Sequence, residues 1–242
     1  AIQGLQLVAV AKGLERPWAL AFLPDGGMLV TERPGRLRLV RGGALDPRPI
    51  AGVPEVHAQG QGGLLDIALH PDFARNRTLF LSYAHGTAQA NRTRIARAVL
   101  DAEAHVLREL RVIFEVNREK PGSQHFGSRL LVLPDGTLLA TIGDGGNPPA
   151  MLDGRPIRDN AQDLSNHIGA VVRITEDGGI PRDNPFLGRA DARPEIWSYG
   201  HRNAQGLAWD PIRRVIWSNE HGSRFGDELN RLEPGRNFGW PL

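Results

Sequence analysis

The sequence contains no cysteine, and only two of its 242 residues, Lys12 and Lys120, are lysines. Without cysteine the chain cannot form disulfides, thiolate metal sites or a cysteine nucleophile. No apolar run approaches the roughly 20 residues that a membrane-spanning helix needs, so the sequence predicts no membrane span. Arginine supplies almost all of the positive charge and is scattered along the chain. Because the net charge is only +2, we expect no nucleic-acid partner.

Four segments repeat one pattern, in which an apolar run, a turn and a second apolar run follow each other. They are residues 18–30, 64–81, 129–140 and 206–217. Their turns contain Pro-Asp-Gly or related residues, which favour tight turns, so each segment predicts a strand, a tight turn and a strand. Hairpins repeated in this way are typical of radially arranged blades. The sequence therefore predicts an all-β protein of the β-propeller class, with about four blades at roughly 40–50 residues per blade.

The rest of the chain contains further strand-like segments and one long irregular stretch. Residues 94–100 and 109–116 read as strands, whereas residues 144–164 are rich in Gly, Pro, Asn and Asp. An irregular stretch of that length in a compact domain is usually functional. No linker or change of composition divides the chain, so we expect residues 1–242 to form a single β-propeller domain.

Two clusters of reactive side chains stand directly before the third and fourth hairpins. His125 lies in the segment 124–129, and a histidine with a pKa near 6.5 can take a proton from a hydroxyl at neutral pH. Arg202 and Asn203 lie in the segment 200–206, where a planar cation and an amide can bind an aromatic cofactor or an oxyanion. Taken alone, His125 also fits a packing role, and Arg202 also fits a loop arginine paired with a carboxylate.

A third cluster, residues 220–230, combines glycines with acidic side chains. Gly222 and Gly226 allow tight turns in which backbone carbonyls converge, and Asp227 and Glu228 follow. Calcium takes six to eight oxygen ligands and accepts backbone carbonyls together with carboxylates. The spacing is not that of an EF-hand, and a solvated acidic loop is the alternative interpretation.

Together these clusters give the sequence a strong resemblance to the soluble, pyrroloquinoline-quinone (PQQ)-dependent aldose sugar dehydrogenases of the glucose/sorbosone dehydrogenase family. The matching motifs cover nearly the whole chain and occur in the order of that family. They are residues 17–22, 60–65, 70–73, 125–129, 144–146, 161–164, 183–186, 200–207, 227–230 and 237–241.

The resemblance implies a six-bladed propeller that binds PQQ and calcium and oxidises aldoses to lactones, with hydride passing from the anomeric carbon to the quinone. By similarity, His125 is the general base, and Gln61 and Arg202 complete the catalytic residues. The implied PQQ-binding residues are Gln61, His125, Arg202 and Asn203. The implied calcium-binding residues are Gly222, Ser223 and Asp227 at one site, and Glu228 with the carbonyl of Phe238 at a second site.

The resemblance also implies an aldose substrate, an external electron acceptor and a periplasmic or secreted location, while a monomer and a homodimer both remain open. The family has further blades beyond the segment matched here, so we expect the given chain to be C-terminally truncated. Two alternatives remain. A non-catalytic binding propeller would keep the scaffold without bound quinone, and a calcium-dependent lactone hydrolase would need acidic side chains that converge on one metal.

Overall fold

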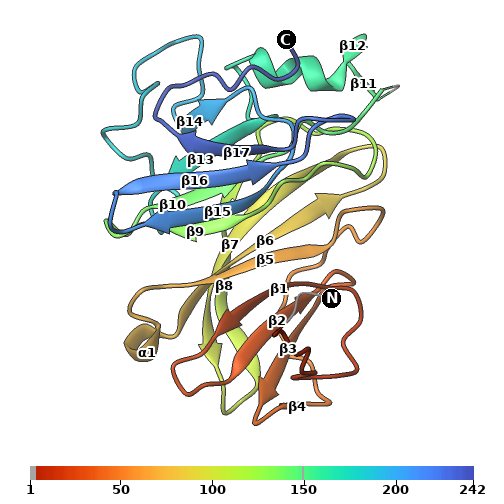
Figure 1. The fold of residues 1–242 in the computed structure, drawn as a ribbon, viewed down its shortest axis with the longest axis vertical. Helices are drawn as coiled ribbons and strands as arrows, with labels where there is room; N and C mark the ends of the chain where they lie inside the picture. The colour runs from red at the N-terminus through yellow and green to blue at the C-terminus, as the bar shows by residue number, and fades with distance from the viewer. Residues whose placement is uncertain (1–3, 149) are drawn as a thin grey trace.

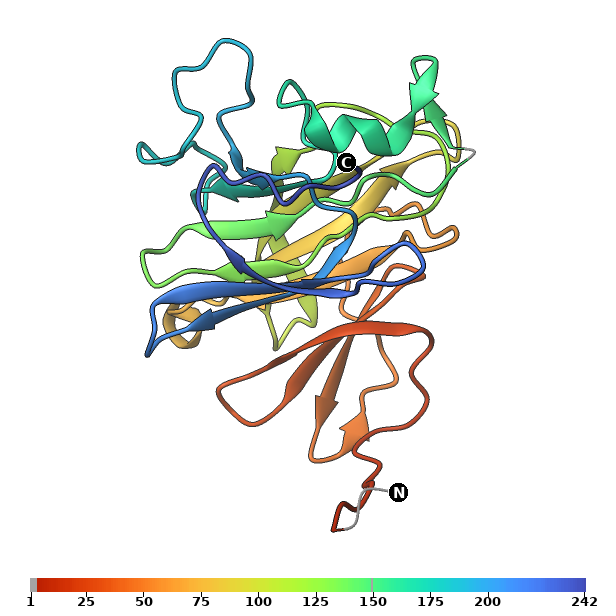
Figure 2. The same cartoon turned by 45° about the horizontal axis from the view of Figure 1, so that its top comes forward.

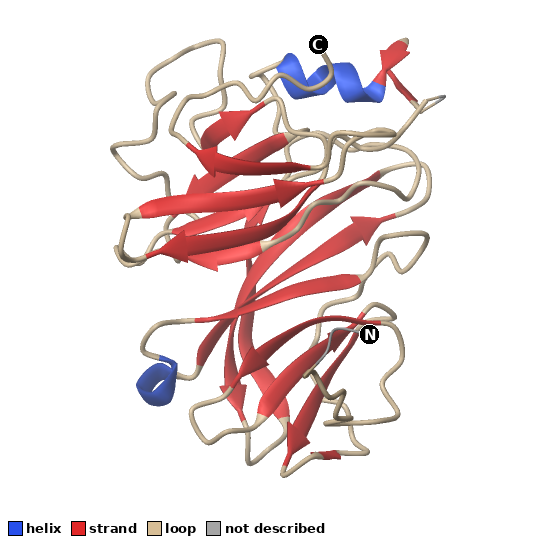
Figure 3. Ribbon diagram, in the orientation of Figure 1, coloured by secondary structure: helices blue, strands red, loops and turns tan. Residues whose placement is uncertain are grey.

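The structure is a computed structural model that describes residues 4–148 and 150–242. Four antiparallel sheets make up the body of the molecule (Figures 1 and 3). The first sheet contains β1 (Pro17–Phe22), β2 (Met28–Glu32), β3 (Arg36–Arg41) and β4 (Ala44–Leu45). The second contains β5 (Leu64–Leu69), β6 (Thr78–Gly86), β7 (Asn91–Asp101) and β8 (Val106–Glu115).

The third and fourth sheets lie together at the end of the molecule opposite the first sheet (Figure 2). The third contains β9 (Leu130–Val132), β10 (Leu138–Thr141), β13 (Ala170–Ile174) and β14 (Ile196–Tyr199). The fourth contains three strands, β15 (Ala204–Asp210), β16 (Val215–Glu220) and β17 (Glu228–Leu232). The predicted all-β propeller with about four blades is therefore confirmed. None of the described helices is long and apolar enough to span a membrane.

Two details of the predicted strands and loops were wrong. The second hairpin does not have a tight turn, because the short helix α1 (Phe73–Asn76) lies between β5 and β6 and ends at Arg77 in the left-handed region, with φ +56°. The stretch 144–164 is not wholly irregular. It contains a small hairpin, β11 (Met151–Leu152) with β12 (Arg155–Pro156), and the 3-10 helix η1 (Ile157–Gln162).

The hydrophobic core lies between successive sheets. Leu79 and Phe80 are neighbours on β6, and alternation along a strand turns their side chains to opposite faces. Leu79 packs in a cluster with residues of the first sheet, and Phe80 packs in a cluster with residues of the third. Leu138 and Leu139 on β10 divide in the same way between the second and fourth sheets. The second and third sheets are thus buried on both faces by their neighbours.

A repeated hydroxyl contact, which we call the hydroxyl bridge, joins each blade to the next. It is made by Thr31 on β2, Ser82 on β6 and Thr141 on β10, which are completely buried. Each hydroxyl accepts a hydrogen bond from the first-strand backbone of its own blade and donates one to a carbonyl of the next blade. Thr31 accepts from the Ala19 amide at 3.0 Å and donates to the Leu65 carbonyl at 2.6 Å. Ser82 accepts from the Asp66 amide at 2.9 Å and donates to the Ser128 carbonyl at 2.6 Å. Thr141 accepts from the Arg129 amide at 3.0 Å and donates to the Ala204 carbonyl at 2.9 Å.

Ser218 on β16 occupies the equivalent position in the fourth sheet. Its hydroxyl is also buried, but it has no hydrogen-bond partner within residues 4–148 and 150–242. A comparison of alanine variants at Ser82 and Ser218 therefore distinguishes the contribution of the hydroxyl bridge to stability from the effect of removing any buried serine hydroxyl.

We predict that Ser82→Ala lowers the free energy of unfolding by about 1–3 kcal/mol, because it leaves a buried amide and a buried carbonyl without partners. Urea denaturation of the chain measures this change. Ser218→Ala is the matched control, and its effect should stay within about 0.5 kcal/mol. Equal losses for the two variants would show that the bridge adds no stability.

Candidate active site

The predicted catalytic and quinone-binding residues gather at one edge of the sheets, because each precedes the first strand of a blade. Gln61 precedes β5, His125 precedes β9, and Arg202 with Asn203 precedes β15. These first strands lie side by side. A pocket of about 170 Å³ opens where the loops meet. Its walls are Trp18, Arg33, Gln61, Leu65, Phe126, Gly127, Asn203, Gln205 and His221.

His125 lies beside this pocket and is paired with Asp144. Its Nδ1 atom is 2.6 Å from Oδ1 of Asp144, and His125 is 4% exposed while Asp144 is fully buried. A carboxylate accepts hydrogen bonds, so the imidazole proton belongs on Nδ1 and Nε2 is left as the basic nitrogen. Within the described ranges Nε2 makes no hydrogen bond and is not among the buried unpartnered atoms. Nε2 is therefore open to accept a proton, while Nδ1 is held by Asp144.

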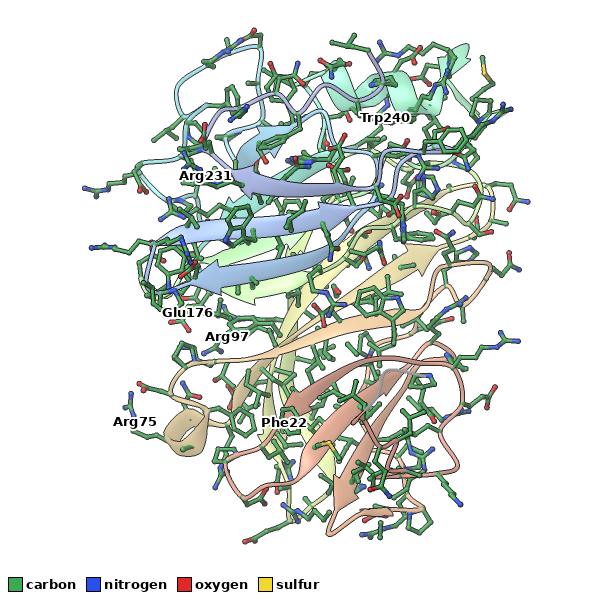
Figure 4. All side chains as sticks on the ribbon, viewed as in Figure 1. Phe22, Arg75, Arg97, Glu176, Arg231 and Trp240 are labelled. Atoms are coloured by element: carbon green, nitrogen blue, oxygen red, sulfur yellow. The ribbon has the colours of Figure 1, made fainter. Side chains whose placement is uncertain are left out.

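Both carboxylate oxygens and the backbone amide of Asp144 make hydrogen bonds. Oδ1 also accepts the amide of Gly146 at 3.0 Å, and Oδ2 accepts the indole Nε1–H of Trp240 at 2.8 Å. Its own amide donates to the carbonyl of Arg202 at 2.7 Å. Trp240 lies near the 3-10 helix η1 in Figure 4, where Gln162 donates to the Trp240 carbonyl at 2.6 Å. The carboxylate is therefore locked from three directions.

The backbone of the His125 loop is held in an uncommon conformation. His125 has φ +48°, a region that costs a non-glycine residue of order 1–3 kcal/mol unless its surroundings enforce it. Its amide donates to Oε1 of Gln61 at 2.8 Å. A Cβ atom on Gly143 would lie 2.1 Å from the His125 carbonyl, so the approach of the two segments requires glycine. Gln61 thus fixes the His125 backbone and also lines the pocket.

Arg202 and Asn203 hold the loops around His125 together. The guanidinium of Arg202 donates to the His221 carbonyl at 3.0 Å and to Oδ1 of Asn147 at 2.8 Å. Its Nε is buried and has no partner in the part of the chain that is described. Asn203 accepts the amide of Gly127 at 3.1 Å. Arg202 therefore keeps an unused hydrogen-bond donor next to the pocket wall.

A buried network beneath Arg202 fixes this loop. His201 bonds to Ser198 Oγ at 2.8 Å and to Glu220 Oε1 at 2.9 Å, and Glu220 Oε2 accepts the Arg202 amide at 2.7 Å. Burial alone would raise the pKa of Glu220, but the hydrogen bonds from His201 and the backbone outweigh it and lower that pKa below its ordinary value. Ser198 and His201 are fully buried, so this serine–histidine–glutamate arrangement is structural.

The residues implied for calcium form no compact cluster of side chains. No group of three or more His, Asp or Glu side chains among the described residues is placed to hold a metal. In the loop between β16 and β17, Asp227 accepts the Gly222 amide at 2.9 Å, which turns the carboxylate toward the loop backbone. Glu228 and Phe238 line a separate groove next to β17.

Comparison with known proteins identifies the family. The family described as Glucose / Sorbosone dehydrogenase matches residues 14–242. The chain belongs to this family. It is 43% identical, over 95% of its length, to the aldose sugar dehydrogenase YliI of Escherichia coli. It is 32% identical, over 96% of its length, to the quinoprotein glucose dehydrogenase B of Acinetobacter calcoaceticus.

Solved structures of glucose/sorbosone dehydrogenases share the fold. The chain superposes on the PQQ-bound aldose sugar dehydrogenase of Streptomyces coelicolor with a TM-score of 0.80 and 35% identity, over 97% of this chain and 65% of that one. It spans 60% and 51% of the length of the E. coli and Acinetobacter proteins. The predicted family and propeller class are therefore confirmed, and the activity of a whole protein remains a proposal.

The structure brings together the residues that the glucose/sorbosone dehydrogenase resemblance implied for catalysis and quinone binding. Gln61 and Asn203 line the pocket, and His125 and Arg202 lie directly behind its walls. Their roles, like the calcium assignments of Gly222, Ser223, Asp227, Glu228 and Phe238, stay predictions.

Two residues of the site were given no role from the sequence. Asp144 stands in a motif shared with the family, and its position in the glycine-rich segment 143–146 was the available signal. Trp240, in another shared motif, bonds to Asp144 across a large sequence separation. No spacing rule joins the three residues of the His125–Asp144–Trp240 chain, so only the fold shows it.

We predict that Glu220→Gln destabilises the chain by about 2 kcal/mol at pH 7, because an amide cannot accept the same set of hydrogen bonds. The pKa of Glu220 is lowered in the folded state, so its stabilisation is present above the unfolded pKa and is lost as pH falls through the folded pKa. The difference should therefore begin to shrink once the pH falls below the ordinary glutamate pKa of 4.5. A series of urea denaturation curves from pH 7 down through the acid range measures it, with the exposed Glu103→Gln as control. A variant as stable as the wild type at pH 7 contradicts the prediction.

Proposed function

We propose that this chain carries the active site of a PQQ-dependent aldose dehydrogenase, which oxidises the anomeric carbon of an aldose to a lactone. The observation that carries the proposal is the pairing of His125 with Asp144 beside a polar pocket. Membership of the glucose/sorbosone dehydrogenase family and the likeness to a PQQ-bound aldose sugar dehydrogenase support it.

The residues at the pocket fit PQQ, which is flat and carries carboxylates and quinone oxygens. Arg33, Gln61 and Gln205 offer a cation and amide donors, and Trp18 and Phe126 offer aromatic walls. The buried, unpartnered Nε of Arg202 is a further donor. The pocket encloses about 170 Å³, below the roughly 300–1,000 Å³ typical of ligand sites, so these residues form one part of the binding surface.

When bound, PQQ supplies the two-electron acceptor for the hydride that leaves the anomeric carbon. His125 Nε2 takes the proton of the anomeric hydroxyl, which leaves that oxygen as the lactone carbonyl. Asp144 holds the imidazole tautomer and stabilises the imidazolium that forms. Gln61 and Asn203 fix the His125 loop from two sides. The cation of Arg202 stabilises negative charge that develops at the cofactor side of the site.

A calcium ion in the proposed enzyme would rest mainly on backbone carbonyls. The donors are those of Gly222 and Ser223 with Asp227 next to them, and Glu228 with the Phe238 carbonyl at the second site. Because the described side chains form no metal cluster, we assign no reaction step to the ion. The external electron acceptor, the periplasmic or secreted location and the oligomeric state stay predictions from the resemblance.

The two alternative functions have less support from the described residues. A calcium-dependent lactone hydrolase needs convergent acidic side chains, and residues 4–148 and 150–242 contain no such group. A non-catalytic binding propeller does not account for the Nε2 of His125 beside the pocket, which is unbonded among the described residues.

We predict that the chain, supplied with PQQ and calcium, reduces an artificial dye with glucose or another aldose as the electron donor. His125→Ala should lower kcat by about 10²–10⁴-fold, because it removes the general base. Steady-state dye reduction measures the change. His70→Ala is the matched control, since His70 follows β5 at the edge of the sheets opposite Gln61.

PQQ absorbance retained after desalting is measured in parallel. If the chain holds PQQ and His125→Ala turns over as fast as the wild type, the assigned base is wrong. If the wild-type chain neither retains PQQ nor reduces the dye, the proposed function fails for this chain.

A further inference from the structure

Arg33 connects the first blade to the loop that carries Gln61. It directly follows β2, and it lines the same pocket as Gln61. Its Nε donates a hydrogen bond to the Gly62 carbonyl at 3.3 Å, and its Nη2 donates one to the Gly60 carbonyl. The guanidinium of Arg33 therefore binds the two carbonyls that flank Gln61 in the sequence.

Other arginines of the first sheet are used differently. Arg36 pairs with Glu32 at 2.7 Å, and Arg41 pairs with Asp25 at 2.9 Å. Both ion pairs stay within the first blade, whereas Arg33 reaches the loop before β5 in the second blade. Hydrogen bonds from a charged donor are stronger than those between neutral groups, so Arg33 ties the two blades together firmly at the pocket.

The loop of residues 60–63 depends on its neighbours for its order. Three of its four residues are glycines, which leave the backbone more conformational freedom than other residues do. A Cβ atom on Gly63 would lie 2.1 Å from the Arg33 carbonyl, and one on Gly60 would lie 2.5 Å from the Ser123 carbonyl. The glycines therefore allow a close approach on both sides, and the flanking segments hold the loop.

On its other side the loop is bonded to the segment that contains His125. The Gln61 amide donates to the Ser123 carbonyl at 2.8 Å, and Gln61 Oε1 accepts the His125 amide at 2.8 Å. The Leu64 amide at the start of β5 donates to the Arg33 carbonyl at 3.1 Å. A path of hydrogen bonds thus runs from Arg33 in the first blade, through the Gln61 loop, to His125 before the third blade.

We propose that Arg33 is a positioning residue for the general base: by holding the two carbonyls beside Gln61 it fixes Gln61, which in turn holds the backbone of His125. This inference rests on the proposed function, in which His125 takes the hydroxyl proton. Arg33 acts on His125 only through Gln61, and it does so by the two bonds of its planar guanidinium. Lysine has the same charge but only one ammonium group, so it cannot reproduce that pair of bonds.

The test is amide hydrogen exchange, followed by NMR at the His125 amide in the chain without cofactor. Arg33→Met should speed this exchange about tenfold, because the loop opens more easily once two hydrogen bonds from a charged donor are lost. Amides of β10 should exchange as in the wild type, whereas a general loss of stability would speed them too. Arg41→Met, which removes an exposed ion pair from the same sheet, is the matched control and should change neither rate.

A double variant shows whether Arg33 acts through Gln61. Gln61→Ala removes the acceptor of the His125 amide, so the further change Arg33→Met should add no acceleration. Unchanged His125 exchange in Arg33→Met, or accelerations that multiply in the double variant, overturns the proposal. If Arg33→Met does not fold, Arg33→Lys decides, because it should also speed the exchange, and a wild-type rate in that variant overturns the proposal.

Arg33→Lys also separates positioning from cofactor binding, because it keeps the positive charge at the pocket. With PQQ and calcium supplied, this variant should retain PQQ and lower kcat about tenfold, since a small displacement of a reacting group is costly. A wild-type kcat, or a loss of PQQ with unchanged His125 exchange, overturns the proposal. The exchange experiment needs no turnover, so a failure of the proposed function is seen separately.

Discussion

The hydroxyl bridge is the contact on which the rest of this structure depends. A buried serine or threonine on the second strand of a blade ties that blade to a carbonyl at the start of the next one. The carbonyls that Ser82 and Thr141 bind belong to Ser128 and Ala204, which directly follow the His125 loop and the Arg202–Asn203 pair. The same contact that stacks the blades therefore sets where the reactive side chains stand.

Around this frame, the site is held by side chains that bond to the backbone of neighbouring loops. Gln61 fixes the His125 amide, Asn203 fixes Gly127, and Glu220 fixes the Arg202 amide. Asp144 joins His125 to Trp240, which lies at position 240 of 242. Such a pre-organised arrangement would need little reorganisation on proton transfer in the proposed reaction, which is the condition for efficient electrostatic stabilisation.

Much of this architecture could be predicted from the sequence because its signals are local. The alternating apolar runs with Pro-Asp-Gly turns predict the hairpins, and motif order predicts the family and the loops that carry His125 and Arg202. The sequence could not predict the α1 turn after His70, since a Pro-Asp step fits several turns. It could not pair Asp144 with Trp240, because only the packing of separate blades brings these residues together.

The most direct test of the account is the effect of Asp144→Asn on dye reduction at saturating PQQ and calcium. Oδ1 and Oδ2 both accept hydrogen bonds, so an amide must place an N–H group against a donor in either orientation. The account predicts a fall in kcat of about a hundredfold or more, with PQQ still retained after desalting. An Asp144→Asn variant that binds PQQ and keeps the wild-type kcat would contradict the central claim that Asp144 orients His125 as the base.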